Sequence, residues 1–259
     1  MYDKKTIAEV RRHAKAHGVR ALLSRPGANP KTSKAAIVDG VYSLPLHLAP
    51  ERLSGWNVCP MATDGCKAAC LHTAGNKAHM PQKERSRLAR TRYYFEHRQH
   101  FDVLLWAELA KLERQADAAG LAPSARLDAT SDLGIAVRWD HADVMPATAF
   151  PRVMFYDYTK VWSRYERFLA GDYPPNYHLT FSLAEHNADR AATYLRHGGT
   201  VAAIFRKAGG GLPESWRGFP VIDGDASDYR PKDPKGHVVG LKPKGAAKAD
   251  TSGFVVDVA

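Results

Sequence analysis

Residues 177–205, YHLTFSLAEHNADRAATYLRHGGTVAAIF, hold a strand, a helix and a second strand in succession. Tyr177–Phe181 and Thr200–Phe205 are short runs of apolar, aromatic and β-branched residues, and His186–His197 between them has helical spacing. A strand–helix–strand unit of this size places its two strands parallel in one sheet. The stretch therefore predicts a parallel α/β fold.

The same alternation continues on both sides of this stretch. Further strands are expected at Ala125–Leu127, Arg152–Tyr156, Phe219–Ile222 and His237–Leu241 (the last of the sheet), with a strand or hairpin in Ala36–Leu48. Helices are expected at Thr6–His17, Gly134–Ala142 and Trp162–Leu169, as a pair within Pro81–Gly120, and as a single turn at Pro213–Gly218. We predict an α/β fold of the partial (β/α) barrel type with N-terminal helical additions. Its domains would be an extension at residues 1–35 and one barrel-like domain at residues 36–259.

Composition narrows the classes of protein. The 259 residues are 44% hydrophobic, and no run approaches the ~20 apolar residues that span a bilayer. The charged N-terminus has no apolar signal segment, and three cysteines make an odd number, so we expect a cytoplasmic protein without disulfides. The net charge of +10 indicates either a polyanionic partner such as nucleic acid or a merely basic surface.

The three cysteines lie close together in NVCPMATDGCKAAC, residues 57–70. Cys59, Cys66 and Cys70 have the spacing C-x6-C-x3-C, and clustered thiolates are the soft ligands that zinc and iron–sulfur centres select. We favour a 4Fe-4S cluster on three thiolates with one open iron. The alternatives are a zinc site completed by His72 or His79, a single nucleophilic cysteine, and three unrelated buried thiols.

Polar residues follow each expected strand, which is where active sites gather in barrels and related sheets. From these positions we expect the following residues to form a site: Asp128, Asp132 and Lys160 as catalytic groups, and Tyr158, Ser182 and Asp223 as cofactor-binding groups. Polar βα loops are common without any site, so position alone carries this expectation.

Other polar and aromatic residues have ordinary explanations. His13, His17, His97 and His100 lie in charged helical segments and are expected to be solvated rather than catalytic. Trp56 could stack on a base or a cofactor adenine, although core packing is the default for aromatic residues.

Three stretches carry a family resemblance: SLPLHLAPERLSGWNVCPMATDGCKAACLHTAG at 43–75, RLDATSDLGIAVRW at 126–139, and FPRVMFYDYTK at 150–160. Together with the segment up to Phe205 they resemble the phage "gene product 88" family. Its layout is similar to radical-SAM enzymes, with a cysteine loop ahead of a partial β/α barrel. Two features depart from these patterns: the C-x3-C-x2-C spacing is absent, and Ser131–Asp132 stands in place of Gly-Asp.

The resemblance implies a phage-encoded iron–sulfur protein in the bacterial host cytoplasm. It would be a radical-SAM-like or other cluster-dependent enzyme, with S-adenosylmethionine as a second cofactor and a small-molecule or nucleic-acid substrate. The alternative is a non-catalytic, basic nucleic-acid-binding protein with a structural zinc or cluster. Salt dependence of binding separates the two, because contacts to phosphates weaken steeply as salt rises.

Overall fold

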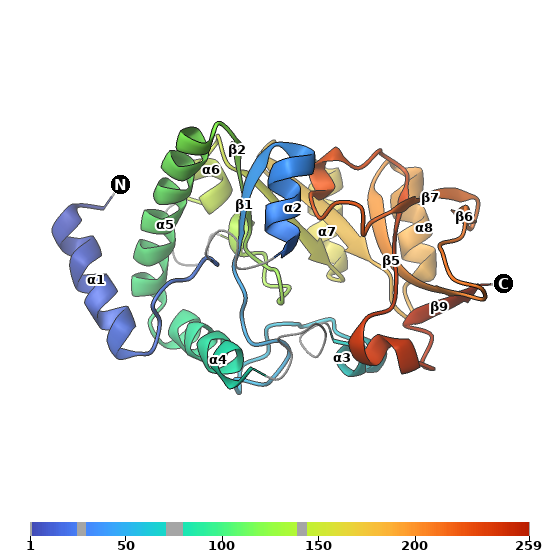
Figure 1. Ribbon diagram of the computed structural model, residues 1–259, viewed down its shortest axis with the longest axis horizontal. Helices are drawn as coiled ribbons and strands as arrows, with labels where there is room; N and C mark the ends of the chain where they lie inside the picture. The colour runs from blue at the N-terminus through green and yellow to red at the C-terminus, as the bar shows by residue number, and fades with distance from the viewer. Residues whose placement is uncertain (1, 25–29, 71–79, 139–143, 259) are drawn as a thin grey trace. The chain divides into compact units, whose positions relative to one another are not determined.

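The computed structural model describes residues 2–24, 30–70, 80–138 and 144–258, without the side chains of residues 30–33. Figure 1 shows the helices and strands along the chain. The chain divides into two compact units, which are described one at a time. Unit 1 comprises Met1–Cys59, Met80–Asp157 and Tyr173–His178, and unit 2 comprises Pro60–His79, Tyr158–Asp172 and Leu179–Ala259. The first 35 residues, predicted as an extension, thus belong to unit 1.

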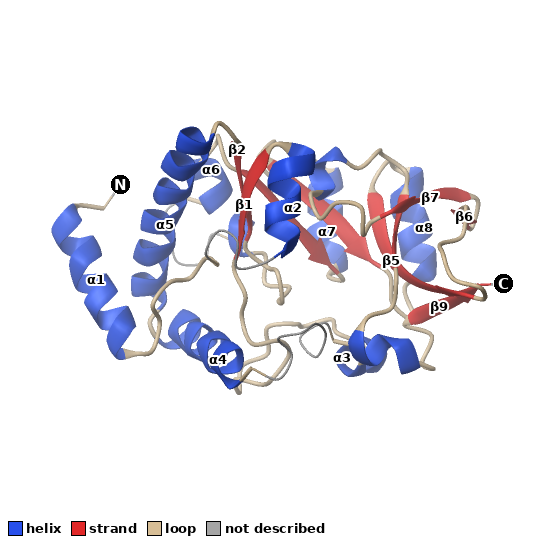
Figure 2. Cartoon of the chain, in the orientation of Figure 1, coloured by secondary structure: helices blue, strands red, loops and turns tan. Residues whose placement is uncertain are grey.

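The strands are hydrogen-bonded in the order β1-β2-β3-β4-β5-β8-β7-β6, and β9 also pairs with β5. Every described ladder is parallel except that of β6 with β7, so the predicted α/β class with a mostly parallel sheet is confirmed (Figure 2). Among the described residues no ladder joins β1 to β6, and the sheet is open. The strands are β1 (Val41–Pro45), β2 (Ala122–Arg126), β3 (Met154–Thr159), β4 (Tyr177–Ser182), β5 (Thr200–Lys207), β6 (Ser215–Trp216), β7 (Phe219–Asp223), β8 (Val238–Leu241) and β9 (Val255–Val258).

Unit 1 contains the strands β1 and β2 with the start of β3 and β4. Its helices are α1 (Lys4–Ala16), α2 (Pro30–Asp39), α4 (Pro81–Glu96), α5 (Arg98–Ala119), α6 (Pro146–Ala149) and a short 3-10 helix, η2 (Ile135–Val137). The predicted pair of helices within residues 81–120 is present, with its break at His97. Helix α5 ends at Gly120, whose φ of 64° is the left-handed conformation that glycine adopts without strain. Its apolar side buries Leu105, Leu109 and Leu112.

Unit 2 contains the rest of the sheet. Its helices are α3 (Asp64–Ala68), α7 (Trp162–Leu169), α8 (Ala188–Arg196) and two 3-10 helices, η3 (Arg230–Lys232) and η4 (Gly245–Ala249). The core packs Tyr165 and Tyr194 against Phe181 and the inner residues of β5. The Tyr194 hydroxyl donates to the Leu179 carbonyl oxygen. A Cβ at Gly199 would lie 1.9 Å from the Tyr194 ring, so only glycine fits at this turn.

Two expectations about the C-terminal region are wrong. Residues 213–218 were predicted as a turn of helix, but Trp216 pairs with Phe219 in a hairpin. Its two turn residues, Arg217 and Gly218, have φ angles of 50° and 82°, the conformation that tight hairpins require. Strand β8 was predicted to be the last, whereas β9 follows it and pairs with the second half of β5.

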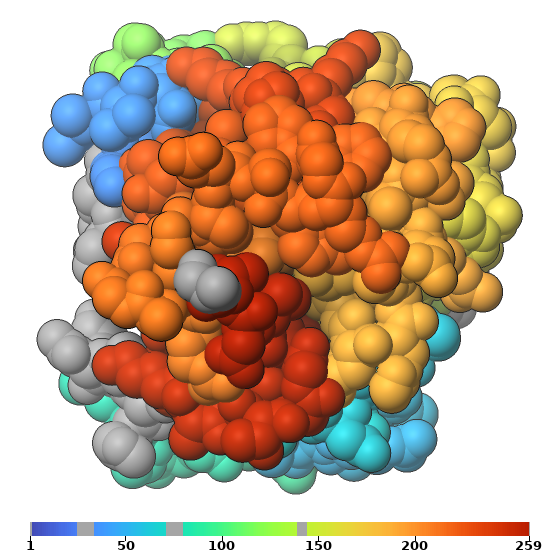
Figure 3. Space-filling view, turned by 90° about the vertical axis from the view of Figure 1, so that its right-hand side faces the viewer, coloured from blue at the N-terminus to red at the C-terminus, as the bar shows by residue number. Residues whose placement is uncertain are grey.

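Strand β9 was not predicted from the sequence. An arginine holds it in place: the Arg206 guanidinium donates to both carboxylate oxygens of Asp257, at 2.6 and 2.8 Å. The C-terminal segment lies on the face of unit 2 that Figure 3 shows, in dark red beside the orange residues that follow α8. Of the predicted helix at 134–142, the structure describes only η2, and residues 139–143 lie outside the described ranges. None of the described helices is long and apolar enough to cross a membrane.

Candidate functional site

The turn after β2 is built around the carboxylate of Asp128, a predicted catalytic residue that is 1% exposed. Its Oδ1 accepts hydrogen bonds from the Ser131 hydroxyl (2.6 Å) and the Leu133 amide (3.0 Å). Its Oδ2 accepts from the amides of Gly134 (2.8 Å) and Ile135 (2.9 Å). Four donors occupy the two oxygens, so the carboxylate closes the turn and holds the chain ahead of η2.

The segment that carries Cys59 lies beside this turn in unit 1. The Thr130 hydroxyl donates to the Leu48 carbonyl (2.6 Å), and the Asp132 amide donates to the Val58 carbonyl (2.8 Å). The Cys59 Sγ lies 3.9 Å from the Thr130 carbonyl oxygen. Because one of these segments follows β1 and the other follows β2, unit 1 places Cys59 at the C-terminal ends of two parallel strands. Ligands bind at these ends in open α/β sheets.

Cys66 lies in helix α3 of unit 2, and a carboxylate holds the start of that helix. Thr63 is the N-cap, and its Oγ1 accepts a hydrogen bond from the Cys66 amide at 3.2 Å. Glu185 accepts from both the Thr63 hydroxyl and the Gly65 amide, the latter at 2.8 Å. Glu185 comes three residues after β4, so unit 2 also holds a cysteine at the C-terminal end of a parallel strand.

The fit around Gly65 is too close for any side chain. An added Cβ would lie 2.1 Å from Ser252 Oγ, 2.4 Å from a Glu185 carboxylate oxygen and 2.8 Å from Phe254 Cβ. Cys66 packs against a small buried cluster made of Ala69, Ala184, Ala247, Phe254 and Val255. Helix α3 is therefore seated on the loop after β4 and on the segment that leads into β9.

Cys70 follows α3 by two residues, and its amide donates to the Lys67 carbonyl at 3.3 Å. None of the three thiols forms a disulfide, and each side chain is partly exposed. Cys59 belongs to unit 1, and Cys66 and Cys70 belong to unit 2. His72 and His79, the alternative zinc ligands, lie outside the described residues.

The other predicted site residues lie at strand ends in unit 2. Tyr158 is a half-buried residue of β3, and Lys160 comes directly after that strand. The Lys160 ammonium lies 5.5 Å from the centre of the Phe254 ring. Ser182 is the last residue of β4 and Asp223 is the exposed last residue of β7. The C-terminal ends of β3, β4 and β7 thus each carry a polar group.

Four basic side chains, which we call the basic group, lie near His47, two residues after β1 in unit 1. The Nδ1 atom of His47 is shielded from solvent and has no hydrogen-bond partner among the described residues. Burial, followed by the charges of Arg87, Arg126, Arg90 and Lys83, lowers the pKa of His47 to about 3. The C-terminal end of β1 is therefore electropositive, an environment suited to an anionic group.

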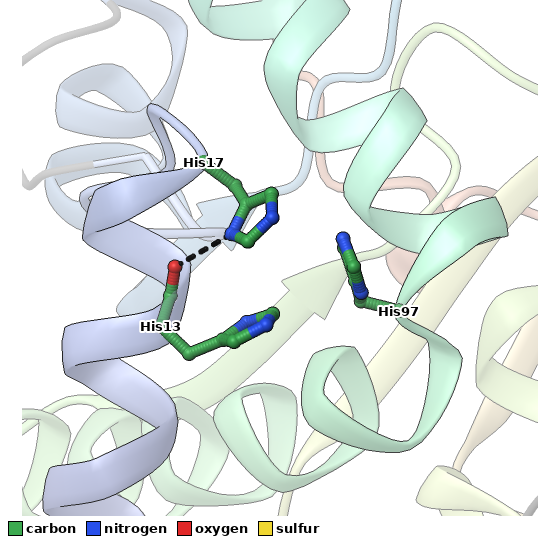
Figure 4. Close-up of side chains that lie close together, drawn as sticks. All are labelled: His13, His17 and His97. Carbon is green, nitrogen blue, oxygen red and sulfur yellow. Dashed lines mark hydrogen bonds between the residues drawn. The ribbon is translucent and has the colours of Figure 1, made fainter.

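Two features of the structure were not foreseen in the sequence. Glu185 was not predicted as the group that holds the cysteine segment. His13, His17 and His97 were expected to be solvated, whereas unit 1 brings their rings together (Figure 4). The sequence feature that could have predicted part of this group is the spacing of four between His13 and His17, which places both on one side of a helix.

These features define a class: an open, mostly parallel α/β protein with cysteines held against the loops that follow its strands. The chain belongs to the Gene product 88 (GP88) family, whose family model matches residues 6–258. This agrees with the resemblance carried by the cysteine segment. No curated protein and no solved structure was found to match the chain.

Proposed function

We propose that this GP88 protein is an iron–sulfur protein in which Cys59, Cys66 and Cys70 hold a 4Fe-4S cluster. One observation carries the proposal: in each unit a cysteine segment is fastened to the loop that follows a parallel strand. The fastening residue is Thr130, after β2, in unit 1 and Glu185, after β4, in unit 2.

The donor set fits such a cluster. Cysteine thiolates are the ligands of 4Fe-4S centres, and three of them leave one iron open. All three side chains are partly exposed and outside disulfides, so they are available as ligands. When bound, the cluster supplies a one-electron donor and an iron that can act as a Lewis acid.

The order of the strands supports the barrel-like part of the proposal. From β1 to β5, strands that are neighbours in the chain are also neighbours in the sheet, with helices between them. Barrels wind in this way, whereas doubly wound sheets reverse their order at a switch point. We therefore keep the partial-barrel, radical-SAM-like layout, with S-adenosylmethionine as the second cofactor, as part of the proposal.

The proposed roles of the strand-end residues follow from their burial and hydrogen bonds. Asp132 and Lys160, which are half-buried, are the candidates to act on a substrate. Asp128 was proposed with them, but its oxygens already hold the turn, so we propose it as a positioning residue. Tyr158, Ser182 and Asp223 remain the proposed cofactor-binding residues. The basic group at His47 favours an anionic small molecule or nucleic acid as substrate, in the cytoplasm of a bacterial host if the chain is phage-encoded.

The test is anaerobic purification followed by an absorption spectrum and by iron, sulfide and zinc analysis. We expect a brown protein with roughly four irons and four sulfides per chain. Cys66→Ala should lose the colour, and Lys67→Ala, on the exposed side of the same helix, should keep it. A colourless protein with one zinc per chain that is lost in Cys66→Ala would replace the cluster with the zinc alternative, and an unchanged spectrum in Cys66→Ala would remove Cys66 as a ligand.

A second candidate function is nucleic-acid binding by a basic, non-catalytic protein. The observation that favours it is an exposed ring platform: Trp56 is 43% exposed and stacks on Phe95, with ring centres 4.6 Å apart. Phe95 lies in α4, which also carries the exposed Arg85 and Arg92. Stacking on aromatic rings and contacts to phosphates are how single strands are bound without sequence preference.

The measurement for this candidate is the salt dependence of binding to a labelled single-stranded oligonucleotide. We expect affinity to fall steeply with salt, and Trp56→Ala to weaken binding by about 1–3 kcal/mol if a base stacks there. Leu53→Ala, another exposed apolar residue near Trp56 in the sequence, is the control. An affinity that changes neither with salt nor in Trp56→Ala would exclude this function.

A further inference from the structure

A group of histidines in unit 1 shares no residue with the cysteine segments and has no role in the proposed cluster chemistry. Figure 4 shows His13 and His17 extending from α1 toward His97, which lies between α4 and α5. One ligand atom from each of the three lies within 4.8 Å of the other two. The spacing of four places His13 and His17 one helical turn apart on the same side of α1.

The rings are packed closely on one another. The centre of the His17 ring lies 4.3 Å from that of His13 and 4.3 Å from that of His97, and the rings of His13 and His97 are 4.7 Å apart. His100, on α5, places its ring 4.3 Å from that of His13. A neutral imidazole carries a lone pair that a cation can share.

The hydrogen bonds orient two of the rings for this purpose. His17 Nδ1 lies 2.9 Å from the His13 carbonyl oxygen. A carbonyl only accepts, so Nδ1 carries the proton and the lone pair is on Nε2. His13 Nδ1 lies 3.2 Å from the hydroxyl of Tyr93, a buried residue of α4. A metal-binding histidine typically uses its other nitrogen in such a bond, which fixes the ring and its tautomer.

We propose that His13, His17 and His97 form a binding site for a divalent transition-metal ion of the zinc type. Imidazole nitrogens suit zinc, nickel and copper, and three of them leave a fourth position for water. His100 is the neighbouring group that could fill that position. The described residues place no carboxylate in the group, which disfavours calcium and magnesium because those ions need oxygen ligands.

A bound ion would join α1 to the junction of α4 and α5. Those elements are far apart in the sequence, so the ion would act as a cross-link within unit 1. An ion that binds only the folded chain stabilises it in proportion to its concentration relative to Kd. The site therefore links the stability of the N-terminal helix to the supply of metal.

The test uses the full chain, freed of metal with a chelator and with its cysteines alkylated. Cobalt(II) is the probe, because its visible absorption reports tetrahedral nitrogen ligation and zinc can displace it. Alkylation removes the thiolates, so failure of this site and failure of the proposed cluster are separate results. We expect one cobalt per chain in the unaltered protein and a rise in Tm with zinc.

The decisive variants are His17→Gln and His97→Gln, each expected to weaken cobalt binding by at least about a hundredfold, more than the loss of a supporting group. His197→Gln is the matched control, because His197 caps α8 with the same kind of bond, from Nδ1 to the Thr193 carbonyl at 2.8 Å. Tyr93→Phe should weaken binding roughly 10- to 100-fold while preserving the packing.

Circular dichroism without metal checks that each variant is folded, and His17 is exposed enough that its substitution should leave the fold intact. The proposal is overturned if the unaltered chain binds no cobalt through nitrogen. It is also overturned if His17→Gln and His97→Gln bind as His197→Gln does.

Discussion

Asp128 and Glu185 occupy equivalent positions in the two units and differ in what they join. Each follows a parallel strand, and each accepts hydrogen bonds from an amide and a hydroxyl. The printed hydrogen bonds of the Asp128 carboxylate come from residues of its own turn, up to seven positions away. Glu185 bonds Thr63 and Gly65, about 120 positions away. The first is a local turn that its own sequence encodes, and the second is a tertiary contact that exists only once the sheet has formed.

The largest expected effect is at Asp128. Asp128→Ala leaves three amides, two of them buried, and a buried hydroxyl without their acceptor, so we expect a loss of about 3–5 kcal/mol in the free energy of unfolding. Urea unfolding at neutral pH measures it. Asp132→Ala, in the same turn but half-buried, should cost less than about 1 kcal/mol. Equal losses in the two variants would contradict the central role of the Asp128 carboxylate.

The next effect concerns acid stability at a third strand end, that of β1. The pKa of His47 is about 3 in the folded chain and about 6.5 when unfolded, so between these values only the unfolded chain binds the proton. The contribution of His47 to stability is therefore fully present above pH 6.5 and is lost as the pH drops toward 3. Part of the side chain is solvent-exposed, so we expect about 2–3 kcal/mol rather than the full value for this shift.

Unfolding of His47→Gln across the same range checks this. The variant cannot take up the proton, so its stability should decline less between pH 6.5 and pH 3 than that of the unaltered chain. The difference between the two curves isolates His47, because every carboxylate titrates in both proteins. Parallel curves would show that His47 is not held neutral by burial and its basic surroundings.

Local sequence was sufficient for much of the fold. The apolar runs of β4 and β5 and the helical spacing between them predicted a parallel unit, and Trp162–Leu169 forms the predicted helix. Elements that depend on distant partners were not predictable. Strand β9 needs β5 and the Arg206–Asp257 pair, and the hairpin of β6 and β7 depends on two positive φ angles rather than on hydrophobic pattern.

The same limit applies to the site. The strand-end positions of Asp128, Ser182 and Asp223 followed from counting residues along the chain. The Asp128 carboxylate accepts most of its hydrogen bonds from backbone amides of its own turn. No pattern of side chains in the sequence reveals such bonds. The histidine group shows the limit most clearly, because His97 meets His13 only through the packing of α1 on the helices that follow it.

A smaller effect is expected for the long-range contact of Glu185. Glu185→Ala removes the acceptor for the Gly65 amide and the Thr63 hydroxyl, and it should lower the free energy of unfolding by about 2 kcal/mol. Because the start of α3 is then released, Cys66 should react faster with iodoacetamide. Peptide mapping of the alkylated protein measures that rate, and Glu214→Ala, an exposed carboxylate of the same unit, is the control. An unchanged rate would mean that Glu185 does not hold the cysteine segment.

The smallest effect is expected at Thr63, whose hydroxyl takes part in two hydrogen bonds. This oxygen accepts from the Cys66 amide and donates to Glu185, so Thr63→Val loses both bonds at nearly constant volume, while Thr63→Ser keeps them. We expect Thr63→Val to cost about 1 kcal/mol, the usual value of a helix N-cap, and Thr63→Ser to cost a few tenths. The double variant Thr63→Val/Glu185→Ala should lose less free energy of unfolding than the sum of the losses in the two single variants, because both substitutions remove the same contact. Full additivity would show that helix capping and the Glu185 contact act independently on the cysteine segment.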